Sequence, residues 1–95
     1  MPALCMTIYT MILDYAGGTF VAQIEATSER DALNRWVEQL RSARIADEVS
    51  DDVASAFETQ PSNGLTPLKG LTNVWCATAT AATGLALVNV VATAG

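Results

Sequence analysis

The chain of 95 residues contains no histidine and only five basic residues. Without histidine it lacks the commonest general base, the commonest metal ligand and every catalytic triad that uses imidazole. No pair of nucleophile and base is recognisable among the remaining residues, although an Asp, Glu, Lys or Cys mechanism stays open. We therefore expect a protein that is not an enzyme and that carries no metal or cofactor.

Long apolar runs are also missing. A helix that spans a bilayer needs about 20 consecutive apolar residues, whereas the apolar segment 85–92 has the length of a buried strand. No basic segment followed by an apolar run and a cleavage site marks a secretory signal. We expect no membrane partner and a cytoplasmic location.

Positive charge is scarce, with five Lys and Arg against ten Asp and Glu, and a net charge of -5. Scattered basic residues give a poor electrostatic footprint for DNA or RNA, so we expect no nucleic-acid partner. The acidic balance suits a basic protein partner, and it is equally explained by solubility.

Cysteine is limited to Cys5 and Cys76. In a reducing compartment both are expected to be small buried apolar residues. A redox pair would require neighbouring strands with Cα atoms within about 7 Å.

The first third of the chain predicts a β-hairpin. Residues 6–15 are rich in β-branched and aromatic residues, and residues 19–26 alternate between apolar and polar. Ala16-Gly17-Gly18 lies between them, and its glycines suit a tight turn. A dinucleotide-binding loop would lead from a strand into a helix, so this segment is predicted to be a turn.

Two helices are predicted next. Ser28 is a suitable N-cap, with Asp31 at the capping-box spacing, and an apolar stripe follows at helical period. A shorter helix is predicted to begin with Ser50 as its N-cap. The segment 43–49 either connects two helices or is a kink in a single one.

The rest of the chain predicts a loop and a second hairpin. Residues 60–71 are interrupted by Pro and Gly, and their three leucines predict that this loop folds back onto the core. Strands are expected over 71–81 and 85–94. The prediction is a single α+β domain, 1–95, with a two-layer, four-stranded antiparallel sheet, one or two helices on one face and the order β-β-α-α-β-β.

The first and last strands are apolar on both faces, unlike a sheet with one solvated side. Each large side chain left in water forgoes about 1.5–3 kcal/mol of burial, and several together form a patch of the size found at interfaces. Either a second protein or the 60–71 loop must cover that face. We expect a homodimer with two-fold symmetry; a monomer rich in small residues is the alternative.

Two groups of residues are candidates for contacts. Tyr9, Tyr15, Trp75 and Asn89 would line an interface or a small pocket, unless the aromatic side chains belong to the core. Asn89 is polar within an apolar strand, so it must be hydrogen-bonded or face solvent.

The second group is acidic and would contact a basic partner: Asp47, Glu48, Asp51 and Asp52. It lacks the ligand spacing of a calcium loop, and helix capping with solvation is the simpler explanation.

The segment YTMILDYAGGTFVAQIEATSERDALNRW, residues 9–36, resembles the N-terminal half-domain of HicB-type antitoxins, which also run strand, Gly-rich turn, strand and capped helix. The second half of the chain departs from that family and has no DNA-binding tail. The resemblance implies neutralisation of a partner. The sequence thus favours a non-enzymatic, homodimeric interaction module of unknown role; the alternatives are an acidic immunity or antitoxin-like protein and a small-molecule-binding protein.

Overall fold

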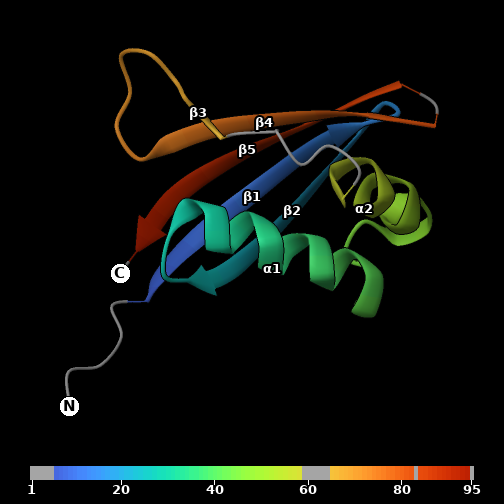
Figure 1. The fold of residues 1–95 in the computed structure, drawn as a ribbon, viewed down its shortest axis with the longest axis horizontal. Helices are drawn as coiled ribbons and strands as arrows, with labels where there is room; N and C mark the ends of the chain where they lie inside the picture. The colour runs from blue at the N-terminus through green and yellow to red at the C-terminus, as the bar shows by residue number, and fades with distance from the viewer. Residues whose placement is uncertain (1–5, 59–64, 83, 95) are drawn as a thin grey trace.

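The computed structural model describes residues 6–58, 65–82 and 84–94. Figure 1 shows the elements in chain order. They are β1 (Thr7–Tyr15), β2 (Gly18–Ala26), α1 (Glu29–Ser42), the short 3-10 helix η1 (Asp47–Val49), α2 (Ser50–Glu58), β3 (Thr66–Pro67), β4 (Val74–Ala81) and β5 (Gly84–Ala94).

The α+β class, the antiparallel sheet and the two helices are confirmed, but the predicted number of strands is wrong. The sheet has five strands in the order β2-β1-β5-β4-β3. The additional strand, β3, lies inside the segment predicted to be a loop and pairs Thr66 with Cys76 and Pro67 with Trp75. It has two residues and contains a proline, which is tolerated at a sheet edge, so neither length nor alternation marks it in the sequence.

The first hairpin has the predicted turn. Ala16 and Gly17 both have positive φ, 53° and 81°, and Tyr15 pairs with Gly18. Two successive residues with positive φ match the type I′ turn, whose twist suits antiparallel strands. This turn fixes the register of β2 against β1, which continues without a shift to the pair of Thr7 and Ala26.

Helix α1 begins as its sequence predicts. The Ser28 hydroxyl accepts a hydrogen bond of 3.1 Å from the Asp31 N–H. The Asp31 carboxylate in turn accepts bonds from the Thr27 N–H and from Arg35 Nε, each 3.0 Å long. In a capping box the side chain at the position of Asp31 would accept the N–H of the cap residue, Ser28. Here it accepts the N–H of the preceding residue, Thr27, and this bond fixes the chain where it enters the helix.

The connection between the helices is a break, not a kink. Arg44 and Asp47 have φ of 49° and 52°, in the left-handed region that stops a helix. Helix α2 begins at Ser50, but Ser50 does not act as the predicted N-cap. Its side chain is fully buried, and its hydroxyl accepts a hydrogen bond of 2.9 Å from the Ala46 N–H. Because η1 leads directly into α2, this side chain ties the connection together instead.

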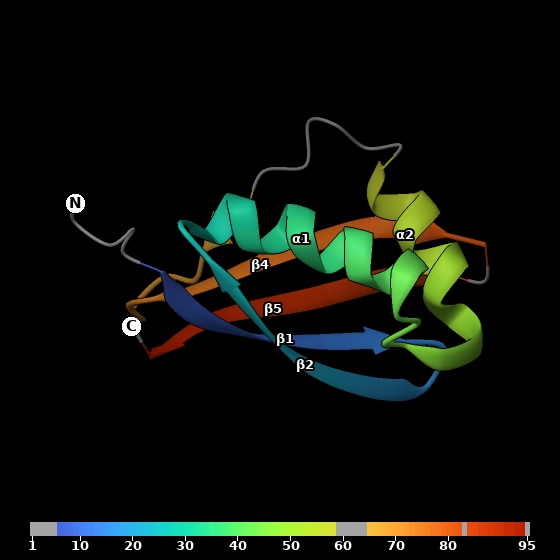
Figure 2. The same ribbon diagram turned by 90° about the horizontal axis from the view of Figure 1, so that it is seen from below.

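Both helices pack on one face of the sheet, called here the inner face. Figures 1 and 2 show α1 running along the sheet, with α2 beyond its C-terminal end. Trp36 meets Phe57 of α2 edge to face, with ring centroids 5.5 Å apart. The strands contribute alternate residues to this core, and the buried ones are Tyr9, Met11, Leu13, Tyr15, Ile24, Ala26, Ala77, Ala79, Ala86, Val88 and Val90.

Candidate functional site

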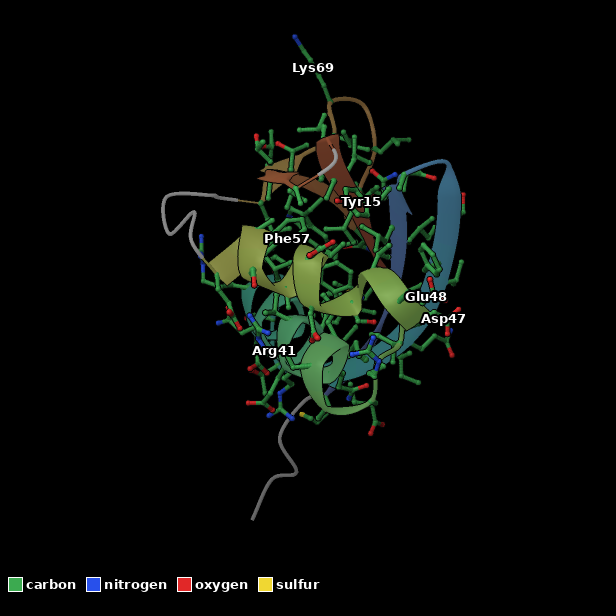
Figure 3. The ribbon with its side chains drawn as sticks, turned by 90° about the vertical axis from the view of Figure 1, so that its right-hand side faces the viewer. Tyr15, Arg41, Asp47, Glu48, Phe57 and Lys69 are labelled. Atoms are coloured by element: carbon green, nitrogen blue, oxygen red, sulfur yellow. The ribbon has the colours of Figure 1, made fainter. Side chains whose placement is uncertain are left out.

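The opposite side of the sheet, called here the outer face, has no helix of the described chain on it. Figure 3 shows the strands curving around the two helices, which leaves the convex side uncovered by them. Its side chains form rows across the strands. One row runs from Val21 through Ile12 and Asn89 to Cys76, and the next runs from Gln23 through Thr10 and Val91 to Val74.

The larger apolar side chains of the outer face are only partly shielded. Val21 is 62% exposed and Leu85 is 60% exposed, while Ile12, Leu87 and Val91 are half-buried by their strand neighbours. Such a group of neighbouring apolar side chains is typical of an interaction surface.

Polar side chains on the outer face bond mainly to one another. Thr19 donates to the Asp14 carboxylate at 2.8 Å, and the Gln23 amide donates to the Thr10 hydroxyl at 3.2 Å. The Thr93 hydroxyl lies 3.1 Å from that of Thr10 and donates to the Ile8 carbonyl. Because these groups have partners within the chain, covering them costs less than covering isolated polar groups.

The described strand residues of the outer face carry little charge, and none of it is positive. The four arginines lie between residues 30 and 44, and Lys69 lies in the turn after β3, pointing away from the body of the protein in Figure 3. The acidic residues on this face are Asp14, near the hairpin turn, and Glu25 on β2. The centre of the face is therefore neutral.

The described part of the 60–71 loop lies at the sheet edge. Leu65 packs against the core, as expected, whereas Leu71 is 59% exposed. The Leu68 N–H donates to the Val74 carbonyl at 3.0 Å, which continues the pairing of β3 with β4. Residues 66–68 thus widen the sheet, while Figure 1 shows the turn after β3 rising on the side of the sheet away from the helices. Residues 60–64 lie outside the described residues.

The four residues predicted to line an interface or a pocket lie on two faces. Tyr9 and Tyr15 are buried on the inner face, and the Tyr9 ring lies 6.2 Å from that of Trp75. Burial, together with the nearby Glu29 carboxylate, raises the pKa of Tyr9. Asn89 lies on the outer face between Ile12 and Cys76. The aromatic residues therefore belong to the core, and Asn89 alone of the four belongs to the outer face.

The acidic candidates lie on the helical side. Asp51 is engaged within the chain, 3.2 Å from Arg44 and 3.7 Å from Arg41. Asp47 and Glu48 are exposed, and Figure 3 shows them beside β2. Asp52 is exposed in the first turn of α2, so all four carboxylates are accessible and Asp51 is paired with arginines of its own chain.

Arg41 joins the two helices. Its guanidinium donates to both oxygens of Glu58, at 3.0 and 2.8 Å, and to the Ser55 hydroxyl at 2.9 Å. The hydrogen bonds from Arg41 lower the pKa of the Glu58 carboxyl. These bidentate contacts hold α1 against α2 and leave the outer face uninvolved.

Only one of the two cysteines belongs to the described part of the chain. Cys76 is a free, half-buried thiol on the outer face, and Cys5 lies outside the described residues. Among the described residues, no three side chains of the acidic, cysteine or histidine type are grouped so that they could hold a metal ion. None of the helices in the described ranges is long and apolar enough to cross a membrane.

The alternation of apolar and polar residues does not predict which strands form the edges of the sheet. Strand order places β2 at one edge, where two open pockets adjoin it. The larger, of about 600 Å³, is lined by Phe20, Arg44, Ala46, Asp47, Glu48 and Val49.

Comparison with known proteins gives no relative: no family model, no curated protein and no solved structure matches this chain.

Proposed function

We propose that this protein is a small, non-enzymatic interaction module that forms a homodimer through the outer face of its sheet. The observation that carries the proposal is that both helices pack on the inner face, while the outer face presents half-buried and exposed apolar side chains. A large apolar side chain contributes about 1.5–3 kcal/mol when it is fully buried. Burying these side chains against a second copy would gain part of that free energy for each of them.

The size of the outer face is sufficient for a dimer. The four long strands lie about 4.8 Å apart and rise about 3.3 Å per residue, which gives a face of about 20 by 30 Å. Two such faces bury about 1,200 Å² together, at the lower limit of the range for specific stable interfaces. The dimer is therefore expected to be of moderate affinity.

The chemistry of the outer face suits a second copy better than a charged partner. Its centre is neutral, so that two copies do not bring like charges together there. Asn89 lies in the row that runs from Val21 to Cys76, and its carboxamide can donate to and accept from Asn89 of a second copy across a two-fold axis.

The proposal is tested with Leu87→Lys, which places a charge on the outer face without touching the core. The matched control is Leu71→Lys, since Leu71 is exposed but lies in the turn after β3 and not on one of the four long strands. Sedimentation velocity should show that Leu87→Lys has lost the outer-face association while keeping the circular dichroism spectrum of the wild type. Leu71→Lys should sediment as the wild type does. Equal sedimentation of all three proteins would contradict the proposal.

A further inference from the structure

We infer that the free edge of β2 is a second self-association site, at which β2 of one copy pairs antiparallel with β2 of another copy. The inference goes beyond the proposed function and does not depend on the outer face. Its occupant is a second copy of this chain, for the reasons of edge geometry, register and charge given below.

The unpaired side of β2 presents backbone groups at regular intervals. Tyr15 and Gly18 flank the two-residue turn and form a hydrogen-bonded pair. Bonded and non-bonded pairs alternate along an antiparallel ladder. The N–H and C=O groups of the odd-numbered residues therefore point away from β1: Thr19, Val21, Gln23 and Glu25. Among the described residues, no strand pairs with this side of β2.

The β2 edge lacks the devices that usually prevent strand addition. Edges are commonly protected by proline, lysine, bulges or short length. Strand β2 has nine residues, contains neither proline nor lysine, and keeps its register against β1 throughout. At the opposite edge, β3 is only two residues long and contains Pro67. The β3 edge is therefore protected against the addition of another strand, whereas the β2 edge is available for it.

The sequence of β2 allows a symmetric pairing that uses all four outward-facing residues. With Ala22 on the two-fold axis, Val21 lies opposite Gln23 of the second copy, and Thr19 lies opposite its Glu25. Each bonded pair exchanges two hydrogen bonds, which gives about eight across the junction. On the inner side, the half-buried Phe20 would lie against Ile24 of the second copy, so the two cores would become continuous.

Each end of the β2 edge carries one arginine and two carboxylates, so charges of both signs meet under the same symmetry. One end of β2 borders an open pocket of about 340 Å³ whose lining includes Glu25, Arg35 and Glu38. The other end borders the pocket beside Phe20, whose lining includes Arg44, Asp47 and Glu48. Antiparallel pairing brings the first pocket next to the second pocket of the other copy. Arg35, which is bonded to Asp31 of its own chain, then approaches Asp47 and Glu48 of that copy. Glu38 approaches its Arg44, which is paired with Asp51.

The test combines a variant of the edge with the variant of the outer face. Gln23→Pro removes an outward N–H, a change that an edge strand tolerates, whereas Gln23→Ala is the control that keeps the N–H. Native mass spectrometry should show a tetramer for the wild type and for Gln23→Ala. It should show a dimer for Gln23→Pro and for Leu87→Lys, and a monomer for the double variant.

The outcomes separate the two proposals. If Gln23→Pro keeps the mass of the wild type, the edge inference is overturned, whatever Leu87→Lys does. If Gln23→Pro halves the mass and Leu87→Lys does not, the edge inference holds and the outer-face proposal fails.

A measurement on the wild type covers the case in which Gln23→Pro does not fold. Amide hydrogen exchange of Thr19, Val21, Gln23 and Glu25 should slow markedly as the protein concentration is raised. The amides of Ala22 and Ile24, bonded to β1, should stay protected at every concentration. Fast exchange of the outward amides even at high concentration would overturn the inference.

Discussion

The turn between β1 and β2 holds a non-glycine residue in the left-handed region, Ala16, with φ of 53°. For residues other than glycine this conformation costs about 1–2 kcal/mol, and asparagine adopts it more readily. Asn-Gly is also the preferred pair for a type I′ turn. We therefore predict that Ala16→Asn raises the free energy of unfolding by about 1 kcal/mol, or the Tm by about 4–8 °C for a domain of this size.

Gly17 provides the matched comparison of opposite sign. Apart from its two chain neighbours, no atom of the described residues would lie within 4 Å of a methyl group at Gly17, so Gly17→Ala changes mainly the backbone preference at φ of 81°. We expect it to lower the free energy of unfolding by about 1 kcal/mol. Urea unfolding should show both shifts with an unchanged m-value. All proteins must be compared at one concentration, because self-association adds to apparent stability.

The assignment of the turn would be refuted if Ala16→Asn gave no gain while Gly17→Ala gave no loss. In that case the two residues would not hold positive φ in solution. The register of β2, and with it the set of outward-facing backbone groups, would then have to be reassigned, because a slip of one residue moves every side chain to the other face.

Two further predictions concern the helices. Trp36 is 2% exposed and meets Phe57, so Trp36→Ala should lower the free energy of unfolding by about 3–5 kcal/mol, while Trp36→Phe should lower it less; equal losses in urea unfolding would argue against this packing. The pKa of Asp31 is lowered, first by the Thr27 N–H and then by Arg35, so its contribution to stability is present above the unfolded-state pKa and is lost as the pH falls through the folded-state pKa. The free energies of unfolding of the wild type and of Asp31→Asn, measured across acidic pH, should therefore converge at low pH. A difference between them that does not change with pH would be inconsistent with a lowered pKa.

Local patterns in the sequence predict the individual strands and their faces well. The alternation of Phe20, Ala22 and Ile24 with mostly polar neighbours predicts which side of β2 is buried, whereas β5 is apolar on both faces and its sequence does not select the buried side. Ser28 and Asp31 predict the start of α1 because the capping bonds are made by near neighbours in the chain. These features depend on contacts over a few residues.

Features that depend on distant contacts are not predictable in this way. Strand β3 is defined by its pairing with β4, in which Thr66 lies opposite Cys76. A segment of two residues is too short to show a periodic pattern in the sequence. Serine is a common N-cap residue, but the Ser50 hydroxyl accepts a hydrogen bond from the Ala46 N–H, which precedes η1. The aromatic candidates Tyr9 and Trp75 are separated from Asn89 by the sheet itself, and only the pairing of β1, β4 and β5 reveals this.

The central claim, that a second copy covers the outer face, is tested most directly by the reactivity of Cys76. This thiol is half-buried in the same row of that face as Asn89, and Cys5→Ser leaves it as the single cysteine. We expect the rate at which a thiol reagent labels Cys76 to fall as the protein concentration rises, and Leu87→Lys to restore the fast rate at every concentration. A labelling rate independent of concentration, and equal in the two proteins, would contradict the claim.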